Sequence, residues 1–175
     1  MGRSSIAIMM LVCFAIALSG TVEAQDKAKT PPCSEAEYAH FDFWVGEWRV
    51  TDPKGVFQGT NRIEKILGGC VLEENWTGAK GMTGHSYNAY AKRRGVWHQT
   101  WVDSNGTLLL LEGGLVDGRM VLRGETPGSE GKGAVSHEIS WELLEDGRVR
   151  QIWRMSHDGG SSWSDAFVGL YTRQE

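Results

Sequence analysis

Hydrophobic and polar residues alternate along much of the chain with the two-residue period that is typical of a β-strand. The alternation is clearest in residues 96–102, VWHQTWV, and in residues 135–143, VSHEISWEL. Clusters rich in Gly, Asp, Asn and Lys interrupt such segments, and these clusters favour tight turns. They lie at residues 52–55, 68–69, 78–81, 92–95, 104–106, 117–118, 126–133, 145–147 and 158–160. Nine turns predict ten segments, most of them short strands.

Consecutive short strands that leave no room for crossover helices pair in antiparallel fashion. We therefore predict an all-β fold, an antiparallel up-and-down β-barrel of about ten strands, in which closure removes exposed sheet edges. A two-sheet sandwich is the alternative interpretation of the same spacing. Only residues 34–43 are predicted as a short N-terminal helix, with Ser34 as the N-cap and Glu37 completing a capping box.

The composition narrows the class of protein. The chain of 175 residues suits a single domain. Its 23 glycines are about twice the share expected from the ~7% typical of globular proteins, which agrees with a fold rich in turns. The net charge is −4 and the basic residues are scattered, so the footprint of a nucleic-acid-binding protein is missing.

The first 24 residues have the pattern of a signal peptide. Arg3 precedes an uncharged run at residues 6–18, which is shorter than the ~20 residues of a membrane span. Ala24 ends the segment, so we expect cleavage before Gln25 and a single mature domain over residues 25–175. An uncleaved N-terminal anchor is the alternative. Cleavage predicts a periplasmic or secreted protein that is not stably inserted in a membrane.

Cysteine use agrees with export. Removal of the signal peptide would also remove Cys13 and leave only Cys33 and Cys70. Because exported proteins meet an oxidising compartment, these two cysteines are a candidate disulfide pair. Two unrelated thiols are the alternative.

Four segments carry a resemblance to known proteins: residues 41–48 (FDFWVGEW), 68–76 (GGCVLEENW), 97–106 (WHQTWVDSNG) and 151–163 (QIWRMSHDGGSSW). Together they make residues 40–172 similar to a family of uncharacterised, often exported calycin-like proteins, which resemble lipocalin barrels. In such barrels the Trp of a Gly-x-Trp motif closes one end under a basic side chain. The resemblance assigns this structural role to Gly46 and Trp48, with Arg173 or Arg154 as the cation. It implies a fold and no activity.

Residues 156–163 invite a second comparison. Ser156, His157 and Asp158 are consecutive and lead into a turn, so they cannot easily converge as a catalytic triad. The segment instead resembles an Asp-box hairpin, which implies that Asp158 caps the turn amides and that Trp163 packs beneath them.

Cofactor chemistry finds little support. Nitrobindins, more distant relatives by the same resemblance, hold haem through one histidine on a late strand, whereas no histidine follows His157 here. Metal-ligand spacing is also missing among the other histidines that follow residue 43, which are His85, His98 and His137. Lys132 follows a glycine but lacks the remainder of a phosphate-binding loop. We therefore expect no cofactor and no metal.

One set of residues stands out, because amide, hydroxyl and carboxyl groups alternate with large aromatic side chains on the same strand faces. Buried polar groups need partners, and a ligand cavity with a few convergent polar groups is one way to supply them. The candidate ligand-binding residues are Glu74, Trp76, Ser86, Asn88, Tyr90, Gln99, Trp101, Gln151 and Trp153. A polar network that stiffens a filled barrel is the alternative.

The sequence therefore predicts an exported lipocalin-like barrel that binds a small hydrophobic or amphipathic molecule. Glu73 and Glu74 are adjacent and face opposite sides of a strand, so they cannot form a catalytic carboxylate pair. Two alternatives remain open. One is an enzyme that uses Glu74 as a base for proton-transfer or hydrolytic chemistry. The other is a structural or interaction protein of the cell envelope with a filled barrel.

Overall fold

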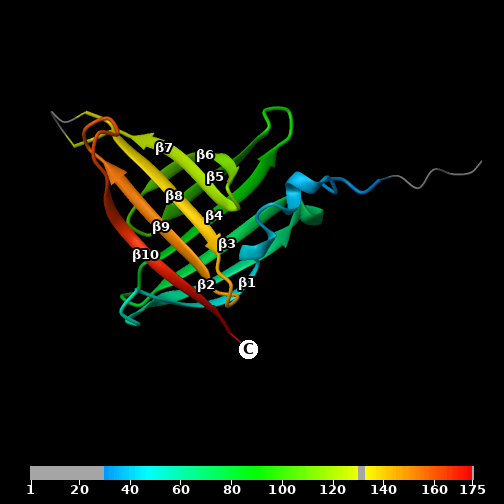
Figure 1. Cartoon of the computed structure of the whole chain (residues 1–175), viewed down its shortest axis with the longest axis horizontal. Helices are drawn as coiled ribbons and strands as arrows, with labels where there is room; N and C mark the ends of the chain where they lie inside the picture. The colour runs from blue at the N-terminus through cyan, green and yellow to red at the C-terminus, as the bar shows by residue number, and fades with distance from the viewer. Residues whose placement is uncertain (1–29, 130–132, 175) are drawn as a thin grey trace, which may run out of the picture.

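The computed structural model describes residues 30–129 and 133–174, which form one closed antiparallel β-barrel (Figure 1). The ten strands are β1 (Gly46–Thr51), β2 (Phe57–Ile66), β3 (Val71–Gly78), β4 (Thr83–Ala91), β5 (Val96–Asp103), β6 (Leu108–Val116), β7 (Arg119–Thr126), β8 (Val135–Leu143), β9 (Val149–Ser156) and β10 (Ser164–Arg173). Each strand pairs with its neighbours in sequence, and β1 closes the barrel on β10. The predicted all-β barrel is confirmed, and the sandwich alternative is wrong.

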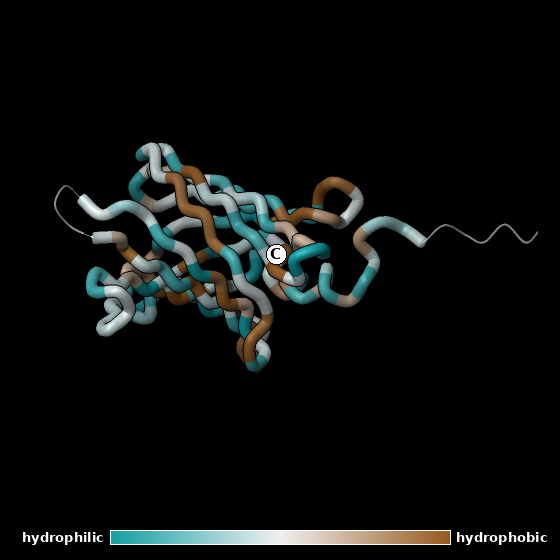
Figure 2. Tube along the Cα trace, turned by 90° about the horizontal axis from the view of Figure 1, so that it is seen from above, coloured by the Kyte–Doolittle hydropathy of each residue, from teal (hydrophilic) through white to brown (hydrophobic). Residues whose placement is uncertain are grey.

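The predicted turns separate these strands. Each of the nine turn clusters falls between two consecutive strands of the barrel. Residues 130–132, within the cluster between β7 and β8, lie outside the described part of the chain. Hydrophobic and hydrophilic residues are mixed along the strands, as a wall with one face in the core and one in water requires (Figure 2).

The N-terminal segment differs from the prediction. In place of one helix over residues 34–43, the segment forms two short 3₁₀ helices, η1 (Ala36–Ala39) and η2 (Asp42–Trp44). A third, η3 (Leu67–Gly69), precedes β3. Glu35 occupies the N-cap position of η1 and no side chain caps it, so the predicted capping box with Ser34 does not form. A short segment gains little from helix propensity alone, and the burial of Phe41 and Trp44 decides its path.

Aromatic side chains fill one end of the barrel. Trp44 of η2 stacks on Phe41, with 4.9 Å between ring centroids, and lies 5.3 Å from Trp141 of β8. Phe41 also makes edge contacts with Trp141 and with Trp97 of β5, at 5.1 and 5.8 Å. All four rings are at most 2% exposed. We call these four residues the aromatic plug. The N-terminal segment that carries Phe41 and Trp44 lies at the end of the barrel away from the turn between β9 and β10 (Figure 1).

The Gly-x-Trp motif lies beside the aromatic plug. The guanidinium of Arg173 lies over the ring of Trp48 at 4.4 Å, and Arg154 lies instead over Trp163 at 5.7 Å. Gly46 has a φ of +144°, and a Cβ built there would be 2.3 Å from Nη1 of Arg173. The motif therefore needs glycine at its first position, because a side chain would displace the arginine. This arrangement is compatible with a calycin-like barrel.

A disulfide joins the N-terminal segment to the barrel. Cys33, before η1, bonds to Cys70, immediately before β3, with the two Cα atoms 5.1 Å apart. The predicted pair is confirmed. It fastens the segment that carries Phe41 and Trp44 to the end of the barrel that these residues close.

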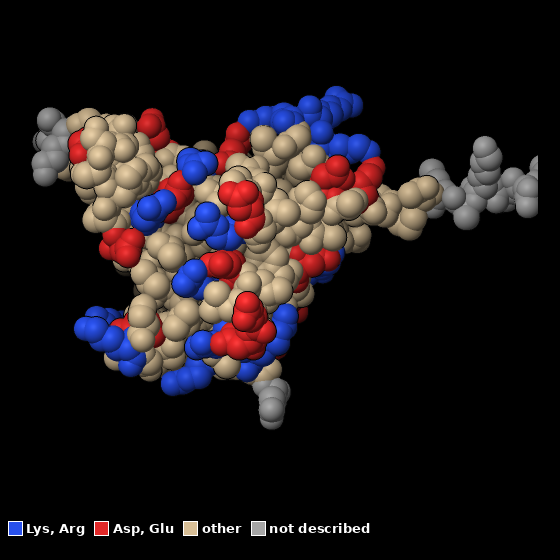
Figure 3. Space-filling model, in the orientation of Figure 1, with Lys and Arg blue, Asp and Glu red and all other residues tan. Residues whose placement is uncertain are grey.

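The predicted signal peptide, residues 1–24, lies outside the described residues. Among residues 30–129 and 133–174, no helix has the length and apolar character needed to cross a membrane. Lys and Arg side chains are interspersed with Asp and Glu on the face drawn in Figure 3. Several of them are paired across strands; Glu138 of β8, for example, contacts both Arg123 and Arg154.

Candidate functional site

The half of the barrel away from the aromatic plug contains a cavity of about 210 Å³. Its wall is mostly apolar and aromatic, with a small polar area. It is lined by Glu74, Trp76, Met82, Gln99, Trp101, Leu109, Ile139, Gln151, Trp153, Ala166, Phe167 and Tyr171. Ala166 is exposed, and Met82 and Phe167 are only partly buried. The cavity therefore reaches the surface at this end of the barrel.

A glycine on β4 helps to explain why space remains inside the wall. Gly84 lies beside Trp101 of β5, and a Cβ built on Gly84 would be 2.3 Å from two carbons of the indole ring. Because this position has no side chain, the ring lies close against the wall and leaves room beside it.

Glu74 of β3 is the carboxyl group of the cavity. The side chain is 5% exposed. Nδ2 of Asn61 donates a hydrogen bond to its Oε1 at 2.7 Å, and Oγ of Ser86 donates to its Oε2 at 2.6 Å. Both donors are neutral, and neither Lys, Arg nor His occurs among the described residues that line the cavity. The carboxyl group is therefore buried without a cation.

This environment changes the proton affinity of Glu74. Burial raises the pKa of the Glu74 carboxyl from 4.5 to about 7, against the opposing effect of the Ser86 and Asn61 hydrogen bonds. Tyr171 of β10 faces Glu74, and burial together with the carboxylate charge raises the pKa of its phenol well above the usual value. At neutral pH the tyrosine is thus uncharged, whereas Glu74 is present both with and without its proton.

A polar network continues beneath the cavity. Nδ2 of Asn88 donates to Oγ of Ser86 at 2.9 Å, and Nε2 of Gln99 donates to Oδ1 of Asn88 at 2.8 Å. Each hydrogen bond joins neighbouring inward positions of β4 and β5 or of β4 alone. The network fixes the amide group of Gln99, and it links Glu74 to β5 through neutral groups only.

Two amides at the cavity keep groups free for a ligand. The Tyr171 hydroxyl donates a hydrogen bond to Oε1 of Gln151, so the Gln151 amide nitrogen remains available. Gln99 uses its nitrogen on Asn88, and its carbonyl oxygen accepts no hydrogen bond from the residues that the structure describes. The cavity thus offers one amide donor, one amide acceptor and a carboxyl group.

The structure separates the predicted ligand-binding residues into three groups. Glu74, Trp76, Gln99, Trp101, Gln151 and Trp153 line the cavity. Ser86 and Asn88 are buried in the network beneath it. Tyr90 does not reach it; this ring packs on Tyr38 at 5.3 Å and on Trp97 at 6.2 Å, beside the aromatic plug. The predicted strand face of Tyr90 did not reveal that the cavity spans only part of the barrel.

Sequence reasoning missed two polar residues, Asn61 and Tyr171. Asn61 donates a hydrogen bond to Glu74, and Tyr171 donates one to Gln151. Alternation along β2 and β10 was the signal that could have identified them. Ala166 and Phe167 were also missed. They are consecutive residues of β10 that both line the cavity, because the strand register shifts between Asp165 and Phe167. A strict two-residue period fails at such a bulge.

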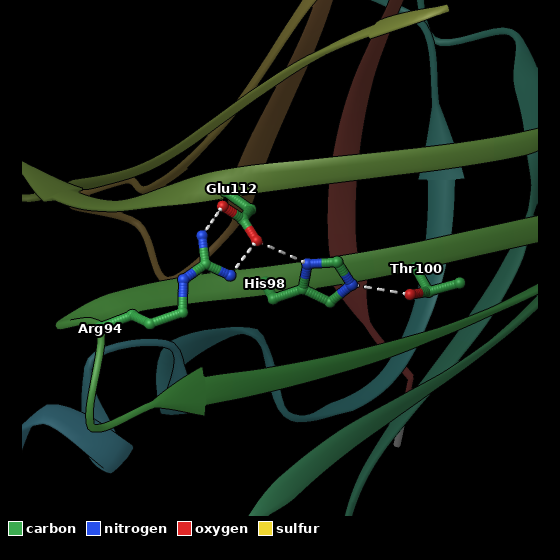
Figure 4. Close-up of polar contacts among 4 residues, drawn as sticks. All are labelled: Arg94, His98, Thr100 and Glu112. Carbon is green, nitrogen blue, oxygen red and sulfur yellow. Dashed lines mark hydrogen bonds and ion pairs between the residues drawn. The ribbon is translucent and has the colours of Figure 1, made fainter.

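A second polar cluster lies on the outer face of the barrel (Figure 4). Nε2 of His98 is 2.8 Å from Oγ1 of Thr100, and its Nδ1 is 3.3 Å from Oε1 of Glu112. Arg94 forms a two-pronged ion pair with the same carboxylate and, as the main cause, lowers the pKa of Glu112. The order of the groups resembles that of a catalytic triad. However, none of the four lines the cavity, so we assign the cluster to cross-strand pairing.

The turn between β9 and β10 has the Asp-box-like hydrogen bonds. Asp158 accepts hydrogen bonds from the backbone N–H of Ser162 at 2.9 Å and from its hydroxyl at 2.6 Å, and these bonds lower the Asp158 pKa to about 2. Trp163 differs from the expectation. It remains 37% exposed, and its Nε1 donates to the Gly160 carbonyl at 3.1 Å, so it covers the turn from outside.

Protonation of Glu74 should be visible in protein stability. The pKa of Glu74 in the folded protein lies above 4.5, its ordinary value. The stabilisation that Glu74 contributes to the folded state is therefore complete below pH 4.5 and is lost as the pH rises to about 7. We expect the free energy of unfolding to fall by up to about 3 kcal/mol across this window. Urea unfolding at pH 5 and pH 8 measures the change.

The matched variants for this measurement are Glu74→Gln and Glu73→Gln. The first should lose the pH-dependent difference, while the second, altered on the outer face, should retain it. The comparison also removes the contribution of His137, whose pKa burial lowers and which acts in the opposite direction. Equal pH dependence in wild type and Glu74→Gln would contradict the raised pKa.

Comparison with protein-family models finds no match, and a search of curated proteins finds none either.

Proposed function

We propose that this chain is an exported β-barrel that binds a small hydrophobic or amphipathic molecule in the cavity beside Glu74. The observation that carries the proposal is a mostly apolar cavity, rich in aromatic residues, whose wall also holds four polar side chains: Glu74, Gln99, Gln151 and Tyr171. Ligand sites commonly combine such a wall with a few polar groups that fix orientation. The Cys33–Cys70 disulfide and the signal-peptide pattern of residues 1–24 support export.

The cavity volume limits the ligand. About 210 Å³ is less than the roughly 300–1,000 Å³ of sites for drug-sized molecules. A cavity of roughly 150 Å³ accepts benzene in another protein. The walls of this cavity can therefore enclose one ring with a short substituent.

The alternative of an enzyme rests on Glu74, because a carboxyl group with a pKa near 7 is suited to act as a general base. Among the described residues that line the cavity, however, Tyr171 is the only other titratable group, and its hydroxyl is engaged by Gln151. A binding function therefore explains more of the residues in the cavity wall than a catalytic function does.

Gln99→Leu tests the location of the binding site. The variant removes the free amide oxygen from the cavity, so the affinity for a polar ligand should fall by about 0.5–1.5 kcal/mol, or up to ~3 if a buried ligand group loses its partner. The loss of the donor to Asn88 should also lower the melting temperature. Tryptophan emission during titration with 2-phenylethanol and 2-phenylethylamine reports the affinity.

The matched control is Thr100→Val, the next residue on β5, which faces outward and contacts His98. It should leave both affinities unchanged. A large change in melting temperature for Gln99→Leu with unaltered affinity for every bound probe would mean that Gln99 is purely structural. If neither probe produces a saturable change in emission, the proposed cavity function is wrong.

A further inference from the structure

The polar groups around the cavity are unequally distributed between donors and acceptors. Nδ2 of Asn61, Oγ of Ser86 and the hydroxyl of Tyr171 each donate one hydrogen bond to a partner inside the protein. Nε2 of Gln99 donates in the same way, and the Trp153 indole N–H donates to Nδ1 of His137 at 3.1 Å. Acceptors remain, because each Glu74 oxygen uses only one of its lone pairs on these donors.

The charges around Glu74 also favour a cationic ligand. Glu74 faces Asn61 of β2, Ser86 of β4 and Tyr171 of β10, and none of these groups supplies a positive charge. No Lys, Arg or His is present among the described residues of the cavity wall. An anionic ligand would meet a carboxyl group and a single free amide donor. A cationic ligand would supply the positively charged partner that the Glu74 carboxylate does not find among these residues.

The aromatic wall also favours a cation. The indoles of Trp76, Trp101 and Trp153 line the same cavity as Glu74. Trp101 is paired across the strands with Ser86, which in turn is paired with Glu74, so carboxyl and indole belong to one row of the barrel. Ammonium groups are attracted to the faces of aromatic rings, most strongly to Trp, and this attraction increases away from water.

We propose that the ligand is a small primary amine carrying one apolar ring, whose ammonium group pairs with the Glu74 carboxylate among the cavity tryptophans. This inference rests on the proposed binding function and names the chemical class of its ligand. The ammonium donates hydrogen bonds to Glu74 and to the free carbonyl oxygen of Gln99. The ring occupies the apolar part between Phe167, Leu109 and Ile139.

Binding of this kind is coupled to proton release. The amine binds the ionised carboxylate, so each protonated Glu74 must lose its proton to solvent when the ammonium enters. An aliphatic ammonium, like that of Lys with a pKa of about 10.4, stays charged between pH 5 and pH 8. The affinity should therefore follow the ionisation of Glu74. With a pKa of about 7, it should be about tenfold weaker at pH 6 than at pH 8, and roughly 90-fold weaker at pH 5.

Two other titratable groups adjoin the site. Tyr171 remains neutral throughout this range because its pKa is raised. His137 of β8 lies behind Trp153, with its Nε2 2.8 Å from the Thr126 hydroxyl, and burial lowers its pKa. Protonated His137 would repel the amine at low pH, in the same direction as protonation of Glu74. A Glu74 variant separates the two contributions.

The experiment compares three probes of similar shape, 2-phenylethylamine, 2-phenylethanol and 3-phenylpropionate, by titration calorimetry. At pH 8 the wild type should bind the amine at least about tenfold more tightly than the alcohol, and the acid least tightly. In Glu74→Gln the preference for the amine and most of its pH dependence should disappear. Glu73→Gln, on the outer face, should behave as wild type.

A measurement on the wild type alone guards against a Glu74 variant that fails to fold. At pH 7, calorimetry in buffers of different ionisation enthalpy should show release of about half a proton for each amine bound, since Glu74 is then about half protonated. Equal binding of alcohol and amine without proton release would overturn the amine assignment and leave the binding function standing. Tighter binding of the acid would overturn it as well. If none of the three probes binds, both the assignment and the binding function fail.

Discussion

Replacing Trp44 with Ala should lower the free energy of unfolding by about 3–5 kcal/mol, the range found when buried Trp or Phe side chains are truncated. Trp44 is fully buried in the aromatic plug, where it contacts Phe41 and Trp141. Its ring also lies 6.4 Å from that of Tyr171. Truncation would leave a void between η2 and the barrel that rigid aromatic neighbours cannot fill. Urea or thermal unfolding measures the loss.

The matched control is Trp163→Ala, which removes the same side chain from an exposed turn. Trp163 is 37% exposed, and its contacts are the Gly160 carbonyl and the guanidinium of Arg154. We expect this variant to lose about 1 kcal/mol or less. Similar losses for the two variants would mean that the aromatic plug does not stabilise the barrel in the way its burial indicates.

Loss of the Cys33–Cys70 disulfide should destabilise the protein by roughly 3–4 kcal/mol if the effect arises from the entropy of the unfolded chain. The two cysteines are separated by 37 positions, and reduction would release this long loop in the unfolded state. Comparing wild type with the double variant Cys33→Ala, Cys70→Ala in urea measures the effect. A reducing agent should shift only the wild type.

The same bond holds the segment that carries Phe41 and Trp44, so the two effects should be coupled. A triple variant that also contains Trp44→Ala should lose less than the sum of the separate losses, because a released segment buries its aromatic side chains less well. Strict additivity would show that the aromatic plug stays in place without the covalent bond.

The fold could be predicted from local signals. Turn residues such as Asp117-Gly118 recur at regular intervals, and the period of two fixes which residues share a face of a strand. The disulfide was predicted because only two cysteines, Cys33 and Cys70, follow the predicted signal peptide. Burial of Phe41 and Trp44, by contrast, depends on the space left at the end of a closed barrel, which no local pattern encodes. Two 3₁₀ helices therefore take the place of the predicted short N-terminal helix.

For the candidate site, the sequence predicted which residues face the barrel interior, but not how far along the barrel axis each one lies. Alternation grouped Glu74 with Gln99 and Gln151 correctly, because every second residue of these strands faces inward. How far along the barrel axis each residue lies depends on strand stagger, so the predicted pocket residue Tyr90 lies beside the aromatic plug instead of in the cavity wall. Asn61 escaped notice because its importance arises from its hydrogen bond to Glu74, 13 residues away in sequence.

Closure of β1 on β10 also determines when the chain can finish folding. Trp48 pairs with Arg173 and Val50 with Tyr171, and Arg173 donates a hydrogen bond to the Val45 carbonyl across 128 positions of sequence. β1 therefore cannot complete its pairing before β10 is present. Such non-local pairing is slow to form. Until β10 is available, the edges of β1 and β9 that pair with it stay unpaired.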